Sequence, residues 1–205
     1  MKVLTCAATL YDQRNTTWAS GYARQGKYTT VMHRGLMVFP ALANNALKDS
    51  NISDIALRIV SAGSGYGSAK DACFYKTDKT TADGTSTSWI TSANYLGAIN
   101  ASFYNSTLTF SSLKTSHASL FNAMKTFFES GGQSLALFRN EEPTTKDYSR
   151  NYLSFTSVEI TIYYEDNNTW YHNGTEWVEC QPYYHNGEQF IPCAVYRHNG
   201  TAWTR

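Results

Sequence analysis

Charged side chains are scarce in this sequence, and their charges almost cancel. Lysine and arginine number 17, aspartate and glutamate number 16, and the formal net charge is +1. Charged residues make up 16% of the chain, against roughly 25% in an average globular protein. A chain without a basic excess has no electrostatic means of gathering nucleic acid. We therefore expect no nucleic-acid partner.

Long apolar runs are also missing. None approaches the roughly 18 residues that a membrane-spanning helix needs. Residues 1–8 (MKVLTCAA) have neither the apolar centre nor the length of a signal peptide. The sequence thus predicts a protein that is made in a cytoplasm and does not insert into membranes.

Motifs for catalysis and metal binding are absent too. The four cysteines form no C-x-x-C pair, and no G-x-S-x-G occurs. Glu141 and Glu142 are adjacent, so their side chains point apart and cannot flank a glycosidic bond. The run 63–67 (GSGYG) lacks the spacing of a phosphate loop and favours a turn, and His33 and His117 have no partner at ligand spacing. We expect a non-enzymatic protein with no cofactor and no metal.

Strand patterns dominate residues 1–165. Apolar and polar residues alternate over 55–60 and over 158–164, as in half-buried antiparallel strands. Shorter strand-like runs fall at 28–39, 72–76, 101–110 and 134–139, with turn residues between them. The pattern predicts an all-β fold, a jelly-roll-like β-sandwich with one or two short helices. Its expected core includes Leu57, Ile59, Phe121, Phe128, Leu137, Val158 and Ile160.

Two segments interrupt the strands with helical patterns. Apolar residues between 120 and 128 share one helical face, with Thr115 or Ser116 as the expected start cap and Gly131 as the stop. A shorter helix is expected to start at Pro40, which suits a first turn. Its inward-facing residues are expected to be Leu42 and Leu47.

The last 40 residues contain a repeat. His-Asn-Gly begins at His172, His185 and His198, a spacing of 13 residues each time. Asn-Gly favours a two-residue type I′ hairpin turn, so residues 166–205 are predicted to form an array of three β-hairpins. Residues three positions out from such a turn face each other across the strands. The expected aromatic pairs are Trp170 with Trp177, Tyr183 with Phe190, and Tyr196 with Trp203.

These six aromatic residues are our candidates for assembly or ligand contact. Stacked hairpins, or equivalent hairpins of a homotrimer, would cover the rings and the strand edges. For Tyr66, Trp89 and Tyr95, the sequence leaves sugar stacking and simple packing open. Cys180 and Cys193 hold equivalent repeat positions and are either a cross-link formed after release or two small buried residues. The repeat histidines are either a metal ring on a trimer axis or solvated neighbours of turns.

Several of these motifs resemble known families. Residues 33–39 (HRGLMVF), 55–59 (IALRI) and 70–76 (KDACFYK) are similar to DNRLRE-type jelly-roll domains. The Tyr-x-His-Asn-Gly-x-x-Trp units resemble the tandem C-terminal repeats of structural proteins in phages and prophages of Gram-positive gut bacteria. The resemblance implies a virion protein, in a tail fibre, a head fibre or a decoration. Such proteins are commonly trimeric, contact other virion proteins and sometimes bind host cell-surface glycans. The alternative is a soluble carbohydrate-binding module or lectin.

Overall fold

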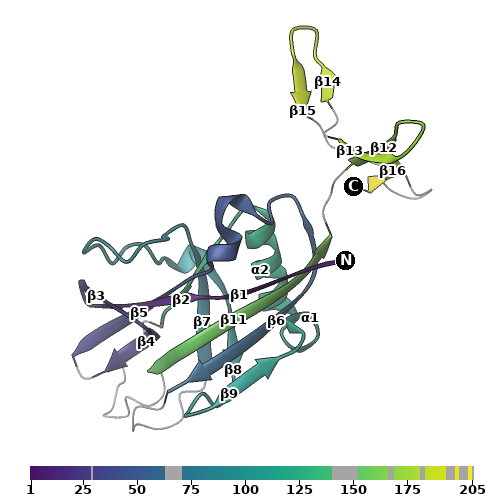
Figure 1. Cartoon of the computed structure of the whole chain (residues 1–205). Helices are drawn as coiled ribbons and strands as arrows, with labels where there is room; N and C mark the ends of the chain where they lie inside the picture. Colours follow the sequence, from purple (N-terminus) through teal and green to yellow (C-terminus); the bar gives the residue numbers. More distant parts are fainter. Residues whose placement is uncertain are drawn as a thin grey trace. The chain divides into compact units, whose positions relative to one another are not determined.

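A computed structural model of the chain describes residues 1–28, 30–62, 71–139, 152–165, 169–180, 183–192, 197–198 and 203–204. The chain forms two compact units, Met1–Glu165 and Asp166–Arg205 (Figure 1). Each unit is described by itself below. The expected GSGYG turn at 63–67 and the pair Glu141 and Glu142 lie outside the described residues.

In the part of the first unit that the structure describes, eleven antiparallel strands form one sheet, and the predicted all-β sandwich is confirmed. Five of the strands, β1 to β4 and β8, were not expected as separate strands. The strands are β1 (Lys2–Ala7), β2 (Thr9–Arg14), β3 (Thr17–Ser20), β4 (Ala23–Tyr28), β5 (Val31–Val38), β6 (Asn51–Ser61), β7 (Asp71–Thr77), β8 (Tyr95–Asn100), β9 (Thr107–Phe110), β10 (Ser134–Leu137) and β11 (Leu153–Glu165).

Strand β4 joins the two halves of this sheet. On one side of it, β11 pairs with β6 along one edge and with β1 along the other, and β6 pairs with β9. On the other side, β5 pairs with β2 and β10, and the order continues through β7 to β8. Because β4 pairs with both β5 and β11, one continuous sheet supplies both layers of the sandwich (Figure 1).

The core between the layers is the one that the sequence predicts. All seven expected core residues are buried, and the alternating positions of β6 and β11 point into one apolar cluster. The period-2 pattern therefore identified the inward faces of both long strands correctly. The inward residues are Ile55, Leu57, Ile59, Val158, Ile160 and Ile162.

Helix α2 (Ala118–Glu129) packs against β6 and β8 and confirms the predicted helical face. Gly131 follows it at φ +95°, as a helix stop requires. The predicted start caps are wrong, because the chain forms a separate short helix α1 (Leu113–Ser116) first. Ser112 caps α1 by accepting a hydrogen bond from the Thr115 backbone N–H at 3.1 Å, and α2 follows His117 without a side-chain cap.

Two short 3₁₀ segments complete the first unit, η1 (Pro40–Asn45) and η2 (Ser92–Asn94). The expected short helix is η1, which starts at Pro40. Leu42 and Leu47 are buried, as predicted.

The second unit contains three two-stranded antiparallel sheets, as predicted. Their strands are β12 (Thr169–His172) with β13 (Trp177–Cys180), β14 (Tyr183–His185) with β15 (Phe190–Pro192), and β16 (Arg197–His198) with β17 (Trp203–Thr204).

The predicted two-residue turns are wrong. In the first hairpin His172 lies opposite Trp177, so the loop has four residues, 173–176. The Asn173 side-chain oxygen accepts hydrogen bonds from the backbone N–H groups of Thr175 and Glu176, at 2.9 and 3.0 Å. This side-chain turn competes with a type I′ turn, and of the Asn-Gly pair only Gly174 has a positive φ. Asn186 holds the second loop in the same way.

The longer loops shift the register of every hairpin. The predicted aromatic pairs are therefore not directly opposite each other, and Tyr196 lies outside the described residues. Each hairpin instead places its repeat histidine opposite an aromatic residue: His172 opposite Trp177, His185 opposite Phe190, and His198 opposite Trp203.

Candidate binding site

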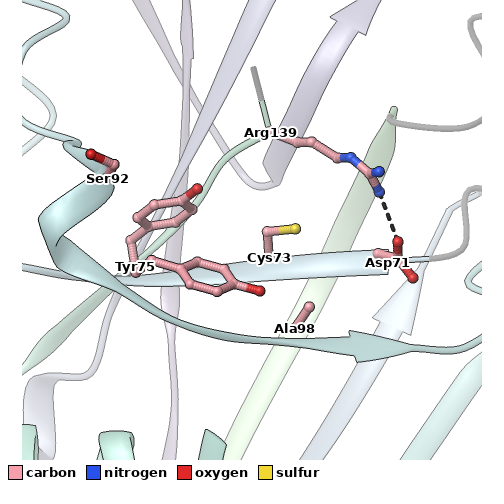
Figure 2. Close-up of a pocket in the computed structure, with 7 residues that line it drawn as sticks. Asp71, Cys73, Tyr75, Ser92, Ala98 and Arg139 are labelled. Atoms are coloured by element: carbon pink, nitrogen blue, oxygen red, sulfur yellow. Dashed lines mark hydrogen bonds and ion pairs between the residues drawn. The ribbon is translucent and has the colours of Figure 1, made fainter. Parts of the chain in front are cut away.

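A pocket of about 560 Å³ opens on the outer face of β7 and β8 (Figure 2). Strand β7 sends Ala72 and Phe74 into the core, where both are fully buried, so the alternate residues face outward. Arg139, which follows β10, and Ser92 of η2 complete the wall. The lining residues are Asp71, Cys73, Tyr75, Ser92, Tyr95, Ala98 and Arg139.

A β-bulge brings the two pocket tyrosines together. Phe74 lies opposite Gly97, but the next β7 residue, Tyr75, lies opposite Tyr95, so the bulge skips Leu96. The rings of Tyr75 and Tyr95 meet edge to face, with centroids 5.2 Å apart. Bulges re-aim side chains in this way, and here the result is an aromatic corner in the pocket.

Gly97 permits the bulge for two reasons. Its φ is +146°, a conformation that residues with a Cβ rarely adopt. A Cβ built there would lie 3.2 Å from the Cβ of Leu120 on α2. The helix behind the sheet therefore packs directly against the point where the strand shifts register.

The floor of the pocket is held by Gln25 of β4, whose side chain is fully buried. Its amide N–H donates to the Asp71 carbonyl at 2.6 Å, and its amide oxygen accepts from the Cys73 backbone N–H at 2.9 Å. Strand β10 ends opposite Phe74, so Gln25 continues the hydrogen-bond ladder beyond that strand. The backbone that carries Asp71 and Cys73 is thus fixed before any ligand arrives.

The electrostatics of the pocket are balanced. Arg139 donates from Nη1 to Asp71 Oδ2 at 2.9 Å, and the two side chains remain 19% and 30% exposed. Burial raises the pKa of Tyr75 and that of Tyr95, and the neighbouring Cys73 thiol adds to both shifts. Both phenols therefore stay protonated at neutral pH and can donate hydrogen bonds. The dashed contact in Figure 2 is the Asp71–Arg139 pair.

A second charged cluster, which we call the Asp12 cluster, is closed to solvent at its centre. Asp12 is fully buried on β2. His33 Nδ1 of β5 lies 2.9 Å from Asp12 Oδ2, Arg14 Nε lies 3.3 Å from it, and Arg24 Nη1 of β4 lies 3.7 Å from it. The cluster therefore ties three strands together at the point where the sheet joins its two halves.

The surroundings of the Asp12 cluster are those of a structural network. His33 packs edge to face on Tyr152, and Arg24 stacks on Tyr22 and donates to Ser154 Oγ at 3.2 Å. A buried His–Asp pair supplies two of the three members of a hydrolytic triad. However, within the described part of the chain the side-chain hydrogen bonds of His33 go through Nδ1 to Asp12. His33 is thus a buried histidine with a satisfied side chain.

The residues for which the sequence left sugar stacking open have different surroundings in the structure. Tyr95 lies in the pocket, whereas Trp89 donates from Nε1 to Gln13 Oε1 at 2.8 Å and packs on Trp18. The Trp89 side chain therefore holds its own loop against β2. Tyr66 lies outside the described residues.

The six hairpin aromatics belong to the second unit, Asp166–Arg205. Among the residues that the structure describes, no group of three or more His, Cys, Asp or Glu is arranged to hold a metal. The described helices include none that is long and apolar enough to cross a membrane. The Cys180–Cys193 alternatives concern side chains outside the described set.

Sequence reasoning missed Asp71, Tyr75 and Arg139 as site residues. The alternation Asp71-x-Cys73-x-Tyr75, which begins one residue before the expected strand 72–76, indicates that these residues share one face. Nothing local in the sequence shows that Arg139 reaches Asp71, because the two residues are far apart in the chain.

No protein-family model matches this chain. No curated protein matches it either. The resemblance to phage structural proteins and to DNRLRE-type domains therefore rests on the sequence motifs alone.

Proposed function

We propose that this chain is a non-enzymatic virion structural protein, displayed on a phage particle for assembly and host attachment. One observation carries the proposal: a β-sandwich with an open pocket is followed by a separate unit of three hairpins spaced 13 residues apart. A β-sandwich with an open pocket is suited to binding a ligand. A short array of hairpins is suited to attachment to a particle or to further copies of the chain.

The hairpin unit is the proposed assembly element. A single two-stranded hairpin is marginal in water, and its unpaired edges invite pairing with other strands. Equivalent surfaces in a homotrimer would cover such edges by symmetry. The candidate contact residues are Trp170, Trp177, Tyr183, Phe190, Tyr196 and Trp203.

Co-sedimentation tests the virion proposal. The full chain should band with purified particles in a density gradient and be labelled by antibody in electron micrographs. Deletion of residues 166–205 should leave the sandwich folded, because its core lies within Met1–Glu165, but should reduce oligomer size in light scattering and incorporation into particles. Normal incorporation of the truncated chain, with both proteins monomeric, would refute the assembly role.

The pocket favours a second candidate, a soluble carbohydrate-binding module or lectin. Its tyrosine corner and Asp71–Arg139 pair combine an apolar surface with hydrogen-bonding groups. A free lectin would be retained on a glycan column and would not band with particles. Retention together with particle banding supports an attachment protein instead.

A further inference from the structure

We infer that the β7–β8 pocket binds a neutral saccharide, with the ring of Tyr95 as its stacking surface and the Asp71–Arg139 pair as its hydrogen-bonding edge. The inference deepens the attachment role proposed above and rests on the sandwich being a binding unit. Three properties of the pocket carry it: an exposed aromatic ring, a balanced ion pair and a preformed floor.

The aromatic ring comes first. Tyr95 keeps 49% of its surface exposed although it lines a pocket. Tyr75 contacts it edge to face, with an angle of 60° between the ring planes. Such a contact fixes the Tyr95 ring without stacking a second ring flat upon it. An exposed, fixed aromatic face suits a ligand with an apolar C–H surface.

The ion pair supplies the polar edge. Guanidinium N–H groups donate and carboxylate oxygens accept, so the Asp71–Arg139 pair, which is joined at 2.9 Å, presents both kinds of hydrogen-bonding group to ligand hydroxyls. The protonated Tyr75 and Tyr95 hydroxyls and Ser92 Oγ lie on the same wall. This mixture of donors and acceptors matches hydroxyl groups, which both donate and accept.

The charge balance selects against ionic ligands. Among the described residues that line the pocket, Asp71 is the one acidic residue and Arg139 the one basic residue, and the two pair at 2.9 Å. A phosphate or carboxylate ligand would have to compete with Asp71 for the guanidinium, and a cationic ligand would have to compete with Arg139 for the carboxylate. A ligand with an apolar face, hydroxyl edges and no charge avoids both costs, and a saccharide has these features.

The pocket is also built before binding. Gln25 fixes the backbone at Asp71 and Cys73, and the bulge at Gly97 sets the position of Tyr95. Preorganisation of this kind lowers the entropy lost on binding. The volume of about 560 Å³ lies in the usual range for small-molecule sites, roughly 300–1,000 Å³.

Cys73 provides a reporter inside the pocket, where Figure 2 places it between Tyr75 and Asp71. The full-length protein is treated with iodoacetamide alone or with a saccharide, and alkylation of the Cys73 peptide is followed by mass spectrometry. The neutral probes are maltotriose, cellotriose, lactose and chitotriose, and the charged probes are trigalacturonate and sialyllactose. At about ten times Kd, a bound neutral probe should slow Cys73 alkylation roughly tenfold.

Variants then locate the binding. Tyr95→Ala and Asp71→Asn should each weaken the protecting saccharide at least tenfold in calorimetry. Tyr104→Ala is the matched control, because Tyr104 is equally exposed, at 47%, and lies outside the pocket lining; its affinity should equal that of the unmodified chain. Circular dichroism confirms that each variant is folded.

Three results would overturn the inference. They are no protection by any neutral probe at about 10 mM, protection by the charged probes alone, and an equal loss of affinity in Tyr104→Ala and Tyr95→Ala. Particle banding is measured independently, so an empty pocket on a particle-bound protein would refute the saccharide site and leave the virion proposal standing.

Discussion

Two clusters in the sandwich use the same pairing of aspartate with arginine and differ in exposure. Asp12 is fully buried among His33, Arg14 and Arg24, whereas Asp71 meets Arg139 at the mouth of an open pocket. A buried charge must keep all its partners, since each lost partner leaves charge uncompensated in a medium of low polarity. Asp71 and Arg139 are partly exposed, at 30% and 19%, so water partly screens their pair and the pair contributes less to folding. We therefore assign the Asp12 cluster to stability and the Asp71 pair to binding.

The largest expected effect is that of Asp12→Asn. The amide keeps the size of the side chain but leaves the nearby guanidinium groups without their counter-charge and gives His33 an uncharged partner. Breaking a buried pair in this way costs about 3–5 kcal/mol of unfolding free energy. Urea unfolding followed by fluorescence measures the loss.

Asp71→Asn is the matched control for that experiment. The same chemical change in the Asp71–Arg139 pair should lower the free energy of unfolding by at most about 1 kcal/mol. Equal losses in the two variants would remove the distinction between a folding cluster and a binding pair.

Gly97→Ala should have the next largest effect. The substitution strains a positive φ and drives a Cβ toward Leu120, which we expect to cost about 1–3 kcal/mol and to displace Tyr95. Gly84→Ala is the control, because Gly84 also has a positive φ, +71°, but no atom lies within 4 Å of its built Cβ. Urea unfolding should show the smaller loss for Gly84→Ala; the reverse order would mean that the helix contact is unimportant.

The pH dependence is the smallest expected effect. The raised pKa values of Tyr75 and Tyr95 mean that the unfolded chain releases these protons at lower pH than the folded chain. The two tyrosines contribute the same stability at every pH below their pKa in the unfolded chain, which is about 10. That contribution is lost as the pH rises from there through their pKa values in the folded chain. Replacing both tyrosines with phenylalanine should flatten the loss of stability above that pH in urea titrations. An unchanged slope would contradict the assignment.

Local periodicity made the core and α2 predictable. Leu57 and Val158 follow a period of two, and Phe121 and Phe128 lie on one helical face, so their burial could be deduced without the fold. The short strands near the N-terminus were harder to see, because their buried positions include the polar residues Asp12, Gln13 and Gln25.

The candidate binding site depends on structural features that no local sequence pattern reveals. The bulge at Gly97 shifts a register, and the Asp71–Arg139 contact joins distant segments. In the hairpins the Asn-Gly dipeptide correctly predicted a turn between strands. The Asn173 side chain then selected a four-residue loop, which moved Trp177 opposite His172. Side-chain competition of this kind is decided by geometry that the dipeptide alone does not contain.

We propose that the Asp71–Arg139 pair serves ligand binding and that the Asp12 cluster stabilises the fold. The most direct test of this proposal is the urea midpoint of the unmodified chain and of Asp71→Asn, each with and without the saccharide that protects Cys73. At about ten times the Kd of the unmodified chain, binding should stabilise that chain by roughly 1.4 kcal/mol. Asp71→Asn, whose affinity is expected to be at least tenfold weaker, should start from nearly the same midpoint and gain at most about 0.4 kcal/mol. A large loss of midpoint in Asp71→Asn without saccharide, or the same ligand shift in both proteins, would contradict the account.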